Sequence, residues 1–187
     1  MDKVTTYSAH SLMTKGAFNL LVDADLELIH QLVGQMAPSL PLLVVDCACA
    51  FNANRVQEII HLAHVAFAPA MEQITITRPF TAYQFNTAIS HLLYDSLTQQ
   101  QLVVVIFPLH LLHDENITAR EAMRLLKLFM RNTVWLKRRV PLVVAVRNRP
   151  DDGQGKGVLF QTLMQAADRV MTFTEPSEQR SVQQSLL

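Results

Sequence analysis

The chain has 187 residues, and 50% of them are hydrophobic, which is enough for one well-packed domain and too few for two large ones. Its 16 basic and 16 acidic residues cancel, so only a local patch could hold a nucleic acid or an anionic membrane. The N-terminus lacks a basic flank followed by an apolar run, and the apolar stretches are too short to span a bilayer. We therefore expect a cytoplasmic or nuclear protein that is neither secreted nor bound to a membrane.

Short apolar runs alternate with longer segments of helical periodicity. The predicted strands cover 18–22, 40–46, 73–77, 101–107, 140–146 and 169–174, and the predicted helices cover 25–37, 53–67, 81–98, 118–138 and 158–167. Continuous apolar runs are typical of strands that are covered on both faces, and helical crossovers connect parallel strands. The sequence predicts a three-layer α/β domain over residues 1–175, with a mainly parallel sheet of about six strands, and a polar tail at 176–187.

The order of these elements, with scattered residues inside them, resembles the core of the RecA/RadA-type recombinases over about residues 16–174. VVDCACAFNANRV at 44–56 resembles the second strand of that family with its following aspartate, phenylalanine and arginine. LVVVIFP at 102–108 falls where the metal-site strand lies, and residues 140–173 resemble the fifth strand, the second DNA-binding loop, a helix and the last strand. The resemblance implies a RecA-like core and a role in DNA recombination or repair.

The resemblance also implies an ATP site, and three of its parts are absent from this sequence. A P-loop needs glycines, a lysine and a hydroxyl residue, whereas the first predicted strand runs through Asp23 and Asp25 directly into a helix. Ala48 stands at the position of the catalytic glutamate, and Phe107 stands where an aspartate would hold magnesium. We therefore expect a non-catalytic paralogue, with no ATPase activity, no catalytic residue and no cofactor.

A glycine-rich loop, GQGKG at 153–157, follows the fifth predicted strand. It departs from a phosphate-binding loop because Gly157 stands in place of the hydroxyl residue. Three interpretations remain open: a solvated surface loop, a mononucleotide pocket, and a contact with nucleic-acid phosphate through Arg147, Arg149 and Lys156. The resemblance favours the phosphate contact, because the family's second DNA-binding loop occupies this position.

Five basic residues recur at helical spacing within the fourth predicted helix. At about 100° per residue they fall in one narrow sector, and we expect the acidic neighbour, Glu121, to point elsewhere. Such a stripe could follow a phosphate backbone, meet an acidic subunit or remain a solvated face. This basic stripe consists of Arg120, Arg124, Lys127, Arg131 and Arg138.

The remaining reactive side chains do not complete a site. Neither histidine pair has a third ligand at a convincing spacing, so we expect no metal centre. The two cysteines, as Cys-x-Cys on a strand, are expected to be reduced thiols on the same face. A Phe-x-x-Ala match at 67–70 is interpreted as a turn. The residues concerned are His61, His64, His110, His113, Cys47 and Cys49.

Our first hypothesis is a binding and assembly module in DNA recombination or repair. It would act through a protein partner or self-association, with DNA as a second ligand. The alternative is a ligand-binding protein or enzyme that uses the crevice at the carboxyl ends of the strands, with Asp23, Asp46 and residues 153–157 as its polar groups. A regulatory subunit unrelated to DNA is a third hypothesis, because a fold does not fix a function.

Overall fold

The chain forms one six-stranded sheet in which every pair of neighbours is parallel. The computed structural model describes residues 15–63, 66–94, 102–147 and 156–173. The strand order is β3-β2-β4-β5-β1-β6. The strands are β1 (Phe18–Val22), β2 (Leu42–Asp46), β3 (Ile74–Thr77), β4 (Leu102–Ile106), β5 (Leu142–Val146) and β6 (Arg169–Thr172). Each lies inside its predicted range, so the predicted α/β architecture is confirmed.

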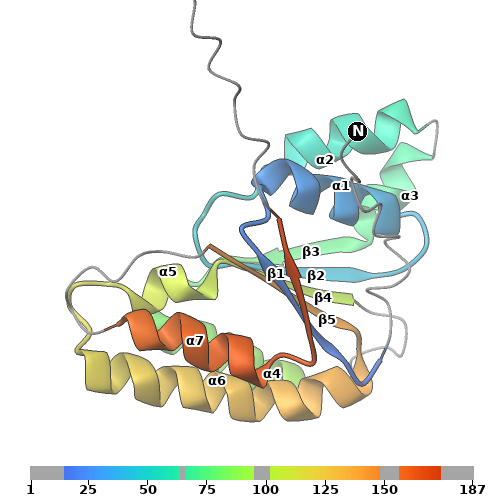
Figure 1. Ribbon diagram of the computed structural model, residues 1–187. Helices are drawn as coiled ribbons and strands as arrows, with labels where there is room; N and C mark the ends of the chain where they lie inside the picture. Colours follow the sequence, from blue (N-terminus) through green and yellow to red (C-terminus); the bar gives the residue numbers. More distant parts are fainter. Residues whose placement is uncertain (1–14, 64–65, 95–101, 148–155, 174–187) are drawn as a thin grey trace, which may run out of the picture.

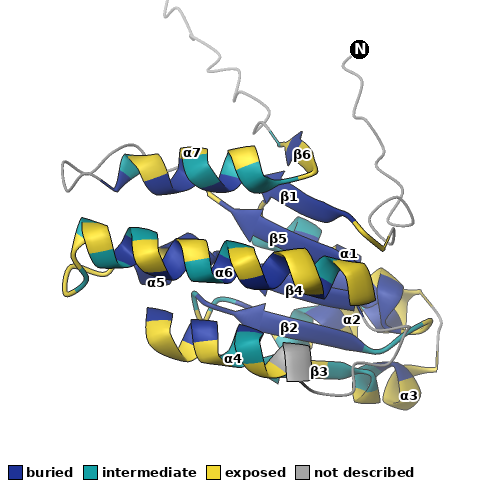
Figure 2. Cartoon of the chain, turned by 90° about the horizontal axis from the view of Figure 1, so that it is seen from below, coloured by how far each residue is buried: buried dark blue, intermediate teal, exposed yellow. Residues whose placement is uncertain are grey.

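Helices cover both faces of the sheet (Figure 1). One face carries α1 (Leu26–Met36), α2 (Ala53–Leu62) and α3 (Phe67–Glu72), and the other carries α4 (Ala82–Tyr94), α5 (Pro108–Leu112), α6 (Ala119–Arg139) and α7 (Gly157–Ala166). Every residue of β1, β2, β4 and β5 is buried, as Figure 2 shows by colour. None of the helices in the described ranges combines the length and the apolar composition that crossing a bilayer requires.

Two short helices were not predicted. The predicted helix at 53–67 ends at Leu62, and a new helix, α3, begins at Phe67. The Phe-x-x-Ala match at 67–70 therefore lies in a helix, and its interpretation as a turn was wrong. The helix α5 has Pro108 in its first turn, where a missing N–H costs nothing. Helices of five or six residues are too short to show a hydrophobic period, which is why the pattern missed them.

Helix α1 packs closely against α2, and Gly34 makes this approach possible. A Cβ atom added at Gly34 would lie 2.8 Å from Cγ2 and 3.2 Å from Cβ of Ile59. The Ile59 side chain is branched at Cβ, so it has few rotamers with which to move away. The glycine is therefore required by the distance between two helices.

We predict that Gly34→Ala destabilises the protein by about 1–3 kcal/mol, because the added methyl overpacks the interface. The direction of the change in stability is informative. Helix propensity alone would make the alanine variant more stable than the wild type by about 1 kcal/mol, so a loss of stability points to the close contact. Chemical denaturation measures the free energy of unfolding. The matched test is Gly34→Ala in an Ile59→Ala background, where the penalty should largely disappear. An equal loss of stability in both backgrounds would contradict the close approach.

The same helix holds the loop after β2 through a buried histidine. The Nε2 atom of His30 accepts a hydrogen bond from the backbone N–H of Asn52, at 3.0 Å. The imidazole also packs on the ring of Phe51, with centroids 5.1 Å apart. Burial lowers the pKa of His30 below its usual value, and the neutral ring is the form that accepts this bond.

We predict that His30 makes the protein less stable under mildly acidic conditions. Because the folded pKa lies below the unfolded value of about 6.5, the unfolded chain binds the proton more tightly. The stability that the neutral His30 side chain contributes is fully present above about pH 6.5. It is lost as the pH falls toward the folded pKa, at no more than about 1.4 kcal/mol per pH unit. Urea unfolding at pH 5, 6 and 7 measures it.

His30→Gln should flatten this pH dependence, because the glutamine oxygen can accept the same hydrogen bond without titrating near pH 6. The matched control is His91→Gln, at an exposed histidine on α4. It should leave the slope of the wild type unchanged. If His30→Gln and the wild type lose stability equally between pH 7 and pH 5, His30 is not the cause.

Candidate functional site

The carboxyl ends of the strands share one edge of the sheet, and the chain leaves this edge in two directions. After β1 and β2 it turns to α1 and α2 on one face, and after β4 and β5 to α5 and α7 on the other (Figure 1). β1 lies beside β5, and β2 lies beside β4. Loops therefore diverge between sheet neighbours, which is the usual position of a ligand crevice in an open parallel sheet.

The turn between β1 and α1 is short, and the carboxylate of one of its residues caps the helix that follows. Only three residues, 23–25, separate the strand from the helix. Asp25 is the N-cap of α1, and its Oδ1 accepts a hydrogen bond from the N–H of Leu28 at 2.7 Å. Asp23 has a φ of 56° and donates its N–H to the carbonyl of Val146 at 2.8 Å. The helix N-terminus, which binds phosphate in many proteins, is thus occupied by an acidic side chain.

The loop after β2 is organised by one buried carboxylate. Asp46 is fully buried and accepts hydrogen bonds from the N–H of Ala50 at 3.1 Å and of Phe51 at 3.0 Å. Arg78 donates to the same carboxylate at 3.2 Å and to the carbonyl of Phe51 at 2.9 Å. Asp46 therefore holds the loop in shape, and Ala48 in that loop faces the crevice as an apolar residue.

The end of β4 carries an unusual backbone conformation. Phe107 has a φ of 51°, its N–H donates to the carbonyl of Ala145, and its carbonyl accepts from the N–H of His110, both at 2.9 Å. Its ring is buried, and the guanidinium carbon of Arg147 lies 4.6 Å from the ring centroid. Two neighbouring strands thus contribute a stacked cation and aromatic ring to the same edge.

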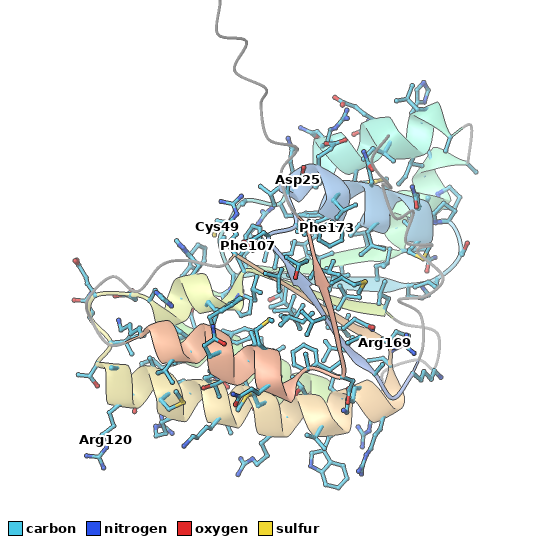
Figure 3. The ribbon with its side chains drawn as sticks, in the orientation of Figure 1. Asp25, Cys49, Phe107, Arg120, Arg169 and Phe173 are labelled. Carbon is cyan, nitrogen blue, oxygen red and sulfur yellow. The ribbon has the colours of Figure 1, made fainter. Side chains whose placement is uncertain are left out.

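A cavity of about 260 Å³ opens beside this pair. Its apolar wall includes Leu26 at the start of α1, two alanines of the β2 loop, and Phe160 of α7. Its polar wall consists of Arg147, His110 and His113, and no acidic residue lines it in the part of the chain that the structure describes. In the view of Figure 3, Phe107 and Cys49 are labelled below Asp25, at the end of the sheet where α1 begins.

The structure corrects the predicted role of Lys156. This lysine is only 1% exposed, and its Nζ donates a hydrogen bond to the backbone carbonyl of Asp114 at 2.7 Å. It joins the start of α7 to the loop before α6 and is not available to a phosphate. Arg147 is exposed, as expected of a phosphate contact. Arg149 and most of the 153–157 loop lie outside the described residues.

All five members of the basic stripe are exposed on α6. The expectation that Glu121 points elsewhere was wrong: its carboxylate lies 2.7 Å from Nη2 of Arg124. The hydrogen bond from Arg124 lowers the pKa of Glu121 to about 2. Arg138 stacks on Trp135, with its guanidinium carbon 5.4 Å from the ring centroid. Two of the five charges are thus already engaged by neighbours on the same helix.

The histidines and cysteines do not gather into a metal site. In the described ranges, no three residues among His, Cys, Asp and Glu lie close enough to hold a metal ion. His110 lies on α5, and His113 is the C-cap of this helix. His64 lies outside the described residues. The cysteines are not on one strand face, since both follow β2; Cys47 is buried and Cys49 is exposed.

The sequence placed a possible crevice at this edge, with Asp23, Asp46 and residues 153–157 as its polar groups, but it missed the pair of Arg147 and Phe107. It treated Arg147 as a contact to nucleic-acid phosphate in a surface loop, and Phe107 as the residue that stands where an aspartate would hold magnesium. A usable signal existed, because both residues directly follow buried strands and therefore had to reach the same edge of a parallel sheet. The stacking of one on the other needed the strand order, in which β4 and β5 are neighbours.

Comparison with known proteins identifies the fold. No protein-family model matches the chain, and no curated protein sequence matches it. Among solved structures, the crystal structure of the RadB recombinase superposes with a TM-score of 0.64 and 16% sequence identity. The match covers 92% of this chain and 82% of that chain. At this identity the likeness shows the fold alone: the chain has the six-stranded α/β fold of a RecA-like core.

Proposed function

We propose that this protein is a non-catalytic subunit with a RecA-like fold that acts as a binding and assembly module in DNA recombination or repair. It works through a protein partner or a second copy of itself, with DNA as a second ligand. The observation that carries the proposal is the turn between β1 and α1, where Asp25 caps the helix inside a fold shared with a recombinase.

The electrostatics of the sheet edge support the absence of ATP chemistry. Two carboxylates, Asp23 and Asp25, stand at the turn and repel a triphosphate. Ala48 can neither orient nor deprotonate a water molecule, and Phe107 offers no oxygen to magnesium. The lysine in the glycine-rich loop is already bonded to Asp114. In the described part of the chain, the residues at these positions are thus unsuited to phosphoryl transfer or are committed elsewhere.

The outer face of α6 supports an assembly role. Trp135 is 57% exposed, and Val134 beside it is also exposed. Toward the other end of the helix, Tyr83 of α4 donates to Glu121 at 3.0 Å and leaves its ring exposed. Exposed aromatic residues beside arginines are typical of protein interfaces. The basic stripe on the same face favours an acidic partner surface.

We predict that the protein neither binds nor hydrolyses ATP. Calorimetric titration with ATP and magnesium should give no binding with a Kd below about 1 mM, because the phosphate cradle and its cation are lacking. A phosphate-release assay should match the buffer blank. The contrary result would be micromolar binding that is lost in Asp23→Asn and retained in Glu72→Gln, a control at an exposed acid on α3.

We predict that the stripe on α6 serves a protein interface. Arg131→Gln with Trp135→Gln should change the oligomeric state by light scattering, or the set of proteins that co-purify, and should leave DNA affinity unchanged. Lys15→Gln, at an exposed basic residue outside α6, is the control. Anisotropy with single-stranded and duplex DNA is measured over a salt series.

The DNA interpretation has a distinct signature in the same experiment. If the stripe contacts phosphates, Lys127→Gln should lower the slope of log affinity against log salt by about one unit, because one fewer counterion is released. We expect a lower salt slope only for the double variant that carries Arg147→Gln and Arg149→Gln. Curves identical to the wild type for that double variant would eliminate DNA contact at the loop, and a changed slope for Lys127→Gln would contradict the protein interface.

A further inference from the structure

We propose that the cavity at the carboxyl edge of the sheet binds a small organic molecule that carries one carboxylate on an apolar body. This inference goes beyond the proposed function, because an assembly module needs no small-molecule site. It depends on a fixed cation, on local backbone strain and on the lining of the cavity.

Arg147 is held in place before any ligand arrives. Its guanidinium carbon lies 4.6 Å from the centroid of the Phe107 ring, and that ring is buried. The backbone of Phe107 is itself fixed by hydrogen bonds to Ala145 and from His110. A guanidinium stacked by its face keeps its N–H edge available, and that edge matches the two oxygens of a carboxylate. Arg147 forms no ion pair with any acid in the described ranges.

The backbone around the cavity is strained at several points. In the described part of the chain, three non-glycine residues have positive φ: Asp23 at 56°, Cys49 at 52° and Phe107 at 51°. They follow β1, β2 and β4, so all three lie at the carboxyl edge. Strained residues of this kind persist where the surrounding structure imposes them, and they concentrate at ligand sites. Here the strain places the ring that supports Arg147 and shapes the loop that contributes two alanines to the wall.

The lining determines the class of ligand. Ala48 and Ala50 are small, and Leu109 and Phe160 supply apolar surface, so the body of the ligand is apolar. The volume of about 260 Å³ is slightly below the range of about 300 to 1,000 Å³ for pockets that hold drug-sized molecules. The wall holds one permanently charged cation, Arg147, beside the two histidines His110 and His113, so it fully compensates one negative charge of a ligand. A monocarboxylate therefore fits, whereas a nucleoside triphosphate does not.

The proposal is tested with hexanoate and benzoate as probes and with hexanamide and benzamide as neutral counterparts of the same shape. Ligand-observed NMR and calorimetry measure binding to the full chain. We expect saturable binding of at least one acid, and binding at least about tenfold weaker for its amide. Inorganic phosphate should not compete, because it lacks an apolar body.

Arg147→Gln should weaken binding of the acid at least about tenfold. The matched control is Arg138→Gln, which removes a stacked, exposed arginine at the far end of α6 and should leave binding unchanged. Ala48→Leu provides an independent variant, because it fills the cavity without changing charge and should also weaken binding. Thermal melts check that each variant is folded.

Several outcomes would overturn the proposal. These are no saturable binding of either acid up to about 10 mM, equal binding of acid and amide, competition by phosphate, or equal affinity in Arg147→Gln and Arg138→Gln. An active ATPase would defeat the proposed function and leave these measurements unaffected. The assembly role and the ligand site therefore fail separately, whereas the DNA contact shares Arg147 with the ligand site and is tested by the salt series.

Discussion

The parallel sheet, buried on both faces, is the constraint on which the rest of the molecule depends. Parallel neighbours need crossover connections, so every carboxyl end arrives at the same edge. Since β4 and β5 turn to one face while β1 and β2 turn to the other, the loops diverge there. The three residues with positive φ, the Asp25 cap and the cavity all lie at this edge. The opposite edge of the sheet holds the amino ends of the strands.

Three polar side chains at this edge form hydrogen bonds within the protein. Asp25 caps a helix, Asp46 holds the β2 loop, and Lys156 bonds the carbonyl of Asp114. Buried polar groups need such partners, because a donor or acceptor left unsatisfied away from water is costly. These three side chains thereby stabilise the loops at the carboxyl edge of the sheet. Arg147 differs, since it stacks on an aromatic ring and keeps its N–H groups available.

The outer face of α6 is separate from the crevice in both position and chemistry. Arg124 is paired with Glu121, so the field of the stripe comes mainly from the other four residues, including Arg138, which keeps its charge while it stacks on Trp135. Figure 3 shows Arg120 pointing away from the body of the molecule. A surface of this kind contributes more to the choice of partner and to the rate of association than to affinity. The proposed assembly surface and the proposed ligand site therefore lie on different parts of the domain.

The sequence by itself determined the strands, the long helices and the lack of P-loop residues between the first strand and the helix that follows it. These depend on local patterns, namely buried apolar runs, a helical period and residue types within a few positions. Only the tertiary structure decided the roles of Lys156, Asp46 and Arg147. Lys156 meets Asp114 across 42 positions and Arg78 meets Asp46 across 32, and no local pattern encodes such separations. Arg147 faces Phe107 because β4 and β5 are neighbours in the sheet, and strand order is set by packing of the whole chain.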